Sequence, residues 1–386
     1  MSAQISFLDG TYTLIHIPLD LYNTFLQPIL RVLIPQTQSL RVDGSSMHHE
    51  DLDGLSAENQ HGFLNISVTP LECSIVCHTS WARNVFDAIV SSLPAHKSRA
   101  ISGLTESYMI LSVISADLDA ASRVLDLSSP LALAGIPIFF ITTYYSDFIL
   151  VPSRERHNVM DALHDKGFEL SDTNASFVIS RKNSASHHSA SPPGTPPPSN
   201  NDELQSRTFL LLRKRNVSPR VDRGLELVQC SGRDMSQLAD AYGPRASVGR
   251  HAPTDNRDAW IENVDTKFYT AVVSALISQP RFVSVTLARD DPPSLLVDKS
   301  LLPMFGDSIV GDKDAILVPI FLDLVNLPSE VTGIVCGVSG RLVHDMKMTA
   351  TSELSYLSTA RAGVVILPEQ QCTRALGILK PLLEQE

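Results

Sequence analysis

One segment of this chain occurs twice. Phe140–Pro152 (FITTYYSDFILVP) is matched 216 positions later by Tyr356–Pro368 (YLSTARAGVVILP). Nearly every apolar position stays apolar, and both positions with a small hydroxyl keep it. The spacing is too long for a solenoid repeat, so it predicts a duplicated domain unit. A chain of two similar halves has a seam between them where small ligands tend to bind, which favours binding or sensing over catalysis.

Composition narrows the class of protein. The 386 residues are enough for two to four small domains, and the net charge of −11 argues against nucleic-acid binding. Five scattered cysteines without a CxxC pair are typical of reduced thiols in a cytosolic chain. The first ten residues have no basic stretch of the kind that opens a secretory signal, and the longest apolar run, Leu131–Ile141, is too short to cross a bilayer. We therefore expect a cytoplasmic protein with no nucleic-acid or membrane partner.

A Pro/Ser-rich stretch divides the chain. Lys182–Asn201 contains five prolines and five serines and cannot bury a core, so residues 181–206 are predicted to be a disordered linker. Ser191 and Thr195 each precede a proline and could be phosphorylated, although a plain linker explains them as well.

On either side of this linker, the hydrophobic pattern alternates strand, helix, two strands, helix, strand. Ser107–Ile114 and Phe209–Leu212 are predicted strands, and Ala259–Ser278 and Gly333–Val343 are predicted helices, the last after a Thr332 cap. This order is the ferredoxin-like βαββαβ pattern of an α+β fold. It predicts four units in two pseudo-symmetric halves, at residues 1–100, 101–180, 207–312 and 313–386.

Residues that could carry catalysis or bind metal give weak signals. His48 to Asp53, with His61, form a polar cluster whose spacing fits no standard metal site. Asp290 and Asp291 precede two prolines and are better explained by a turn than by acid–base chemistry. No nucleotide-binding or zinc-hydrolase motif occurs. We expect no catalytic residue, no metal and no cofactor.

Four segments taken together resemble a known family. They are Leu21–Pro35 (LYNTFLQPILRVLIP), Leu64–Val76 (LNISVTPLECSIV), Pro130–Pro152 (PLALAGIPIFFITTYYSDFILVP) and Leu357–Glu369 (LSTARAGVVILPE). These segments are similar to the CASTOR family, cytosolic arginine sensors of the TOR kinase pathway that are built from ACT domains. The match is clearest over residues 11–35, 62–78 and 107–168, weaker over 256–386, and absent over 36–60 and 182–206.

The resemblance implies an amino-acid site between the second and fourth ACT units. In such a site, backbone N–H groups at a helix start hold the ligand carboxylate, and a glycine lets the backbone come close. The positions of this sequence that match the family's site are Pro137, Ile138, Val331, Thr332, Gly333, Ile334 and Gly363.

Three of these positions depart from the family pattern. Gly363 stands where the family has a carboxylate for the guanidinium of arginine, and Pro137 lacks both the expected hydroxyl and an N–H group. An acidic position falls on Val331, with Glu330 one residue away. Because a buried guanidinium without a carboxylate costs on the order of several kcal/mol, these residues disfavour arginine as the ligand. Two alternatives stay open: the ligand is a smaller or less basic amino acid, or the pocket is vestigial and binds none.

The repeated hairpin also resembles the family's docking patch for the GATOR complex, through Tyr144, Tyr145 and Asp147. Exposed aromatic side chains beside an acid are good interface anchors, although the same residues could only shape the turn. Three functions follow as hypotheses: an amino-acid sensor in TOR nutrient signalling, an interaction scaffold without a ligand, and a regulator that acts in trans on amino-acid biosynthesis. The sequence leaves open whether the protein forms a homodimer.

Overall fold

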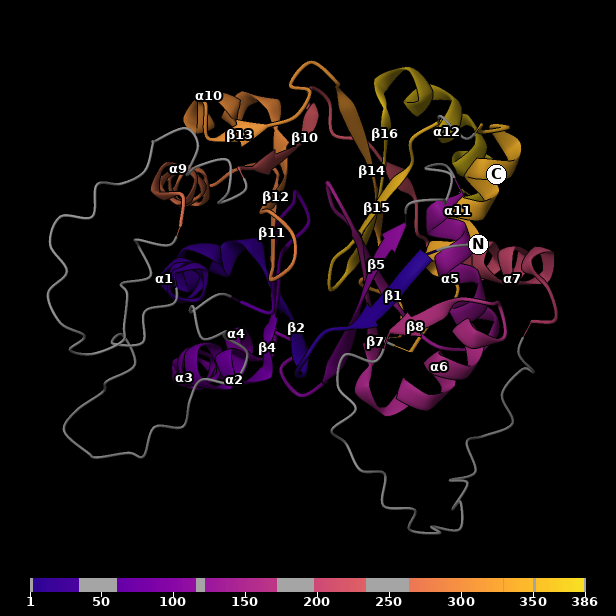
Figure 1. The fold of residues 1–386 in the computed structure, drawn as a ribbon, viewed down its shortest axis with the longest axis horizontal. Helices are drawn as coiled ribbons and strands as arrows, with labels where there is room; N and C mark the ends of the chain where they lie inside the picture. The colour runs from indigo at the N-terminus through magenta and orange to yellow at the C-terminus, as the bar shows by residue number, and fades with distance from the viewer. Residues whose placement is uncertain are drawn as a thin grey trace, which may run out of the picture.

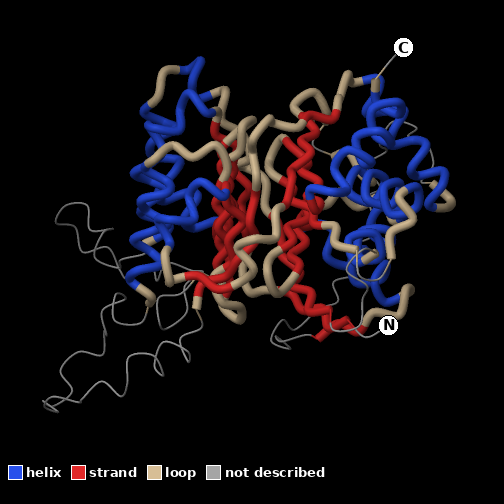
Figure 2. The backbone as a smooth tube through the Cα atoms, turned by 90° about the horizontal axis from the view of Figure 1, so that it is seen from above, coloured by secondary structure: helices blue, strands red, loops and turns tan. Residues whose placement is uncertain are grey.

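The computed structural model describes residues 3–34, 61–115, 122–171, 198–233, 264–328, 330–349 and 352–384. They form an α+β fold in four layers. Figure 2 shows helices on the two outer sides and strands in two layers between them. No helix of these residues is long and apolar enough to cross a membrane.

Sixteen strands of the described residues form one sheet, and twelve of them close into a flattened ring with two facing walls. The first wall contains, in spatial order, β10 (Leu227–Gly232), β12 (Ser294–Asp298), β11 (Val283–Ala288), β3 (Phe63–Val68), β4 (Cys73–His78) and β2 (Tyr12–Ile17). The second wall contains β5 (Tyr108–Ser115), β7 (Asp147–Pro152), β6 (Phe139–Thr142), β15 (Ser355–Ser358), β16 (Ala362–Pro368) and β14 (Leu317–Asp323). The walls join where Tyr12 pairs with Tyr108 and Leu227 with Leu317. Figure 1 shows the two walls side by side.

Helices cover the outer face of each wall. Beside the first wall lie α1 (Tyr22–Leu33), α2 (Thr79–Trp81), the π-helical turn η3 (Ala82–Asp87), α3 (Ala88–Ser92), α4 (Ala95–Ser98), α9 (Thr266–Ile277) and α10 (Leu302–Phe305). Beside the second wall lie α5 (Arg123–Leu133), α6 (Arg156–His164), α7 (Asn201–Lys214), α11 (Ile334–Asp345) and α12 (Glu369–Leu383). Three large apolar clusters result, one under each helical layer and one between the two walls, and a small fourth cluster lies between α5, α7 and α11.

The remaining strands lie outside the ring: β1 (Ala3–Phe7), β8 (Glu169–Ser171), β9 (Pro219–Arg220) and β13 (Ile309–Val310). β1 belongs to the residues predicted as the first unit, yet it pairs with β5 and β8, which belong to the second. The N-terminal strand therefore completes the sheet of a unit whose other strands begin about a hundred residues later.

Each wall has a seam at which strands from the two halves of the chain meet. In the first wall, β3 pairs with β11 along its whole length, and the hydroxyls of Ser67 and Ser284 lie 2.8 Å apart. In the second wall, β6 and β15 share one backbone pair, Ile141 with Leu357. Two side-chain bonds supplement that pair: Phe140 N donates to Ser358 Oγ (2.9 Å) and Tyr356 N donates to Thr142 Oγ1 (3.1 Å).

One predicted strand was wrong. Phe209–Leu212 lies inside α7, whose first residues, 201–206, were assigned to the linker. The side chain of Asn200 caps this helix by accepting a bond from Glu203 N (2.9 Å). The buried side chains, Leu204, Thr208, Phe209 and Leu212, have helical rather than alternating spacing, so within FLLL Phe209 and Leu212 face the core while Leu210 is exposed. The rest of the linker up to residue 197, and the polar cluster at His48 to Asp53, lie outside the described residues.

Candidate functional site

A cavity of about 250 Å³ lies on the helical side of the second wall, at the seam between its two halves. The end of α5 and the start of β6 form one side of it, and the start of α11 and the β15–β16 hairpin form the other. Five of the seven residues that the resemblance implied for a ligand line it: Pro137, Ile138, Val331, Gly333 and Ile334. The chain thus brings together segments almost two hundred residues apart around one opening.

The other two implied residues, Thr332 and Gly363, are not among the residues that line the cavity. Tyr356 explains the position of Gly363, because its hydroxyl lies directly over this glycine. A Cβ atom added at Gly363 would come 2.3 Å from the Tyr356 hydroxyl oxygen, closer than real Cβ contacts allow. The tyrosine side chain therefore occupies the space into which a carboxylate at position 363 would project.

The start of α11 supplies open backbone donors to the cavity. Its N-cap is Gly333, in left-handed conformation with a φ of 83°, and no side chain caps the helix, so the predicted Thr332 cap was wrong. Ile334, Val335 and Cys336 form the first turn and line the cavity. The described residues give their N–H groups no acceptor. Three unpaired N–H groups and the positive end of the helix dipole favour an anionic group here.

Tyr356 is a second group without a partner. The side chain comes from β15, is only 1% exposed, and lines the cavity. Its hydroxyl has no hydrogen-bond partner within the described part of the chain. Burial raises the pKa of Tyr356, so the hydroxyl stays protonated and can donate. A buried polar group without a partner costs about 1–3 kcal/mol, which is what a bound ligand can recover.

Arg361 has the only charged side chain among the described residues that line the cavity. It lies in the turn between β15 and β16, and its Nη2 donates to Ser102 Oγ at 3.4 Å, a long bond. In the described part of the chain, no carboxylate lies within ion-pair distance of this guanidinium. The cavity wall is therefore positively charged.

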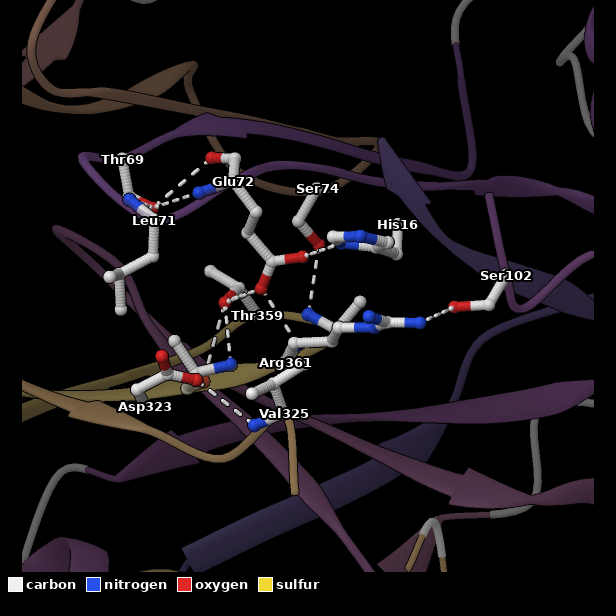
Figure 3. Close-up of polar contacts among 12 residues, drawn as sticks. His16, Thr69, Leu71, Glu72, Ser74, Ser102, Asp323, Val325, Thr359 and Arg361 are labelled. Carbon is white, nitrogen blue, oxygen red and sulfur yellow. Dashed lines mark hydrogen bonds and ion pairs between the residues drawn. The ribbon is translucent and has the colours of Figure 1, made fainter. Parts of the chain in front are cut away.

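A buried carboxylate from the first wall holds the same turn (Figure 3). Glu72, 1% exposed, accepts bonds at Oε1 from Thr359 Oγ1 (2.5 Å) and Arg361 N (2.7 Å). Its Oε2 lies 2.5 Å from His16 Nδ1. Glu72 does not line the cavity, so its charge acts on the turn and on His16 rather than on a ligand. The wall of the cavity is in this way bonded directly to the opposite wall of the ring.

The residues implied for partner binding separate into two groups. Tyr144 and Tyr145 are 39% and 47% exposed, and their rings pack edge to face with centroids 4.9 Å apart. Asp147, in contrast, is fully buried and lies 2.6 Å from Arg123 Nε. The expectation that Asp147 anchors a partner is therefore corrected, because all of β7 is buried and the carboxylate is used internally. Burial raises the pKa of Asp147 to about 6, and Arg123 opposes that rise.

Other reactive side chains lie in structural positions, in a helix, a turn or the core. Ser339 donates to Val335 O within α11 (2.5 Å), and Asp290 and Asp291 lie in the turn between β11 and β12. All five cysteines are free and buried. Within the described ranges, no group of three or more His, Cys, Asp or Glu residues could hold a metal ion.

Sequence reasoning did not identify four residues: Tyr356 and Arg361, which line the cavity, Glu72, which holds its turn, and Arg123, which pairs with Asp147. The repeat could have indicated two of them. Tyr356 stands where the first copy has Phe140 and adds a hydroxyl, and Arg361 stands where it has Tyr145 and adds a charge. Glu72 and Arg123 lie outside the repeated hairpin and have no such signal.

Comparison with known proteins identifies one part of the chain. Residues 104–165, from the approach to β5 through α6, match the family model of the ACT domain. No curated protein matches the chain.

Solved structures with detectable similarity are distant from this protein. A protein from Agrobacterium tumefaciens is 20% identical, with a TM-score of 0.27, covering 45% of this chain and 96% of its own. An aspartate kinase from Synechocystis is 11% identical, with a TM-score of 0.31, covering 99% of this chain, which spans 56% of the kinase. A Vibrio cholerae protein described as a possible transport protein is 14% identical, with a TM-score of 0.23, covering 43% of this chain and 90% of its own. The comparisons accordingly characterise one segment: residues 104–165 match the ACT domain, a ferredoxin-like module that generally binds amino acids in regulatory roles.

Proposed function

We propose that this protein is a cytoplasmic, non-enzymatic regulator that binds an amino acid in the seam cavity and couples its occupancy to partner binding. The partner is a GATOR-like regulatory complex in TOR nutrient signalling, as the resemblance to the CASTOR family implies. The observation that carries the proposal is the cavity itself, in which Pro137, Ile138, Val331, Gly333 and Ile334 meet around the uncapped start of α11.

The proposal includes four ACT-like units in two pseudo-symmetric halves. The bonds across the β6–β15 seam support this symmetry. Phe140 N bonds the hydroxyl of Ser358, and its counterpart in the repeat, Tyr356 N, bonds the hydroxyl of Thr142. The same two repeat positions thus supply the N–H donor and the hydroxyl acceptor in both directions across the seam. This is expected if a twofold axis passes between Ile141 and Leu357, the central pair.

Coupling to the partner surface follows the strands. Ligand bound in the cavity contacts the start of β6 at Ile138, and β6 leads to the turn that carries Tyr144 and Tyr145. The β6–β15 seam has one backbone pair, so a change in its spacing disrupts few ladder bonds. A ligand that binds better to one spacing of the seam shifts the population toward it, and by linkage alters the affinity of the tyrosine surface for its partner.

Thermal unfolding across the twenty amino acids tests ligand binding, because a ligand of the folded state raises the melting temperature by mass action. The matched variants are Ile334→Pro and Ile334→Ala. Proline is tolerated at the first helical position and removes one N–H group, whereas alanine removes the side chain and keeps the donor. We expect the stabilising amino acid to lose effect with Ile334→Pro and keep it with Ile334→Ala. No stabilisation by any amino acid at millimolar concentration would reject the sensing function.

The partner surface is tested by affinity capture with the double variant Tyr144→Ala and Tyr145→Ala. The control is Leu210→Ala, at an exposed apolar position on α7. We expect the double variant to lose the captured complex and the control to retain it, with the amount captured changing when the stabilising amino acid is added. Capture of amino-acid biosynthetic enzymes instead would favour the trans-acting regulator.

One observation favours a ligand-free scaffold as the second candidate. The Tyr356 hydroxyl fills the space over Gly363, where the resemblance implied contact with a ligand side chain. A scaffold would keep its partner without any response to amino acids, so partner capture that is constant across the amino-acid panel distinguishes the two functions.

A further inference from the structure

We propose that the seam cavity selects a small dicarboxylate, with an acidic amino acid as the natural form, rather than a basic or neutral amino acid. This inference rests on the proposed function, because it names the ligand class of the same cavity. It follows from the charges, unpaired donors and volume that the described residues give the cavity.

The charge of the cavity wall favours an anionic ligand. Arg361 is the one charged side chain that the described lining contains, and no carboxylate of the described residues pairs with its guanidinium. A guanidinium has five N–H donors in a planar fork that matches a carboxylate, and here one of them is used, by Ser102. The remaining donors are available to an anionic group.

A second group of donors that can bind an anion lies on a different element, α11. The first turn of α11 presents the N–H groups of Ile334, Val335 and Cys336, with no side-chain cap. Helix starts and guanidinium groups both prefer carboxylates, and these two are separate in the chain and line one cavity. Two such groups of donors suit a ligand with two carboxylates. The α-carboxylate, present in any amino acid, would bind at the helix start, and the second carboxylate would bind Arg361.

Tyr356 adds an independent observation. Its hydroxyl is buried, remains protonated, and has no acceptor within the described residues. The unpaired groups identified at the cavity wall are therefore donors, which need an acceptor from a ligand. A carboxylate oxygen is the group that supplies what a helix start, a guanidinium and a phenol hydroxyl all lack.

The same features count against other amino acids. A lysine or arginine ligand would bring a second cation to a wall that has no described carboxylate, and an unpaired buried charge is strongly unfavourable. A neutral ligand avoids that penalty but leaves Arg361 without a counter-charge. The volume of about 250 Å³ is near the lower limit of small-molecule pockets and suits a ligand of amino-acid size.

Isothermal titration of the full chain tests the inference with aspartate, glutamate, asparagine, glutamine, leucine, arginine and lysine. The variants are Arg361→Met, which removes the charge and keeps much of the side-chain volume, and Arg361→Lys, which keeps the charge without the fork. Arg374→Met is the control, because Arg374 is an exposed arginine on α12 that does not line the cavity. We expect an acidic amino acid to bind at least tenfold tighter than its amide. Arg361→Met should abolish that preference, Arg361→Lys should keep part of it, and Arg374→Met should not alter it.

Succinate and glutarate, titrated in parallel, separate the two sources of a dicarboxylate. Binding equal to that of aspartate or glutamate identifies an ammonium-free dicarboxylate, and weaker binding identifies the amino acid; both results support the inference. Tighter binding of leucine, glutamine or arginine than of the acidic amino acids overturns it and leaves the proposed function standing. An acidic preference that survives Arg361→Met also overturns it. If no amino acid and no dicarboxylate binds, the proposed function itself fails.

Discussion

The β6–β7 and β15–β16 hairpins share one backbone design and differ in what they carry. Both have the same register: Phe140 opposes Ile149 in the first, and Tyr356 opposes Val365 in the second. Both turns are closed by equivalent bonds, Thr143 N to Ser146 O and Thr359 N to Ala362 O, each 2.9 Å. In both, the next residue donates its N–H to a serine of the facing wall: Tyr144 to Ser294 (2.9 Å) and Ala360 to Ser74 (3.1 Å).

The side chains on this common frame determine whether a cavity stays open. At the position after the turn, the first hairpin has Asp147, which is paired with Arg123, and the second has Gly363, which is covered by Tyr356. The first hairpin thus satisfies its carboxylate with an arginine of its own chain. The second has no carboxylate there and leaves a cavity with unpaired donors beside it. The comparison teaches that the two hairpins have the same backbone pairing, while a few side-chain differences give them different uses.

The largest effect is expected when the first hairpin loses its carboxylate. Asp147→Ala would leave the guanidinium of Arg123, only 22% exposed, without its partner and should cost about 3 kcal/mol of unfolding free energy. The double variant Arg123→Met and Asp147→Ala should recover most of this loss, because it removes both charges. Urea unfolding of the four proteins in this double-mutant cycle measures both effects. A loss below about 1 kcal/mol for Asp147→Ala would show that the pair is not a stability determinant.

A smaller effect is expected when the second hairpin receives the aspartate of the first. Gly363→Asp should destabilise the protein by about 2 kcal/mol, because its Cβ meets the Tyr356 hydroxyl at 2.3 Å. In the Tyr356→Phe background, which restores the residue found at position 140, the same substitution should cost clearly less. Calorimetric unfolding gives the difference, and the double variant should gain affinity for basic amino acids. Equal costs in both backgrounds would mean that Tyr356 is not what excludes a carboxylate.

The contacts of the two turns with the facing wall give the third test. Glu72→Gln replaces a carboxylate that accepts bonds from Thr359 and Arg361 and lies beside His16, and should cost about 2 kcal/mol. Ser294→Ala removes a neutral acceptor of the first turn and should cost about 1 kcal/mol. Parallel urea titrations compare them. A larger loss for Ser294→Ala would show that the first turn, rather than the second, is the stronger link between the walls.

The last comparison distinguishes the two hairpins by pH. Burial raises the pKa of Asp147 to about 6 from an ordinary value of 3.8, so between these values the folded state binds more protons than the unfolded state. The contribution of Asp147 to stability is therefore greatest below pH 4 and falls as pH rises through 6, by at most ~1.4 kcal/mol per pH unit. Asp147→Asn should remove this dependence, measured as the difference between its unfolding free energy and that of the native protein from pH 4 to 7. Parallel pH profiles of the native protein and the Asp147→Asn variant over this range would contradict the shifted titration.

The hydrophobic pattern was sufficient for much of the fold. Strands such as Ser107–Ile114 and the repeated hairpin were predictable because strand-forming, apolar residues fill both faces of a wall that is buried on both sides. The helix at Ile334–Asp345 was predictable from its apolar spacing. In α7, the local run FLLL favoured a strand, and the helix depended on the Asn200 cap and on packing that a local pattern does not contain.

The candidate site was predictable in position and not in chemistry. Pro137 and Gly333 were placed by resemblance, and both line the cavity. The bond from Arg361 N to Glu72 joins residues 289 positions apart. The Tyr356 hydroxyl is unpaired because of how side chains pack across the strand pair. Neither feature has a local sequence pattern. The internal use of Asp147 likewise depended on Arg123, whose role appears only when α5 packs against β7.

The position of β1 has a consequence for how this protein can be divided. Residues 3–7 pair with strands that begin at residues 108 and 169, so both of their ladders join segments more than a hundred residues apart in the sequence. Such distant pairing is slow to form, and a fragment cut near residue 100 would carry away a strand that the following fragment needs. Dissection of this molecule into autonomous pieces should therefore fail at that boundary, because β1 would be separated from the sheet that it completes.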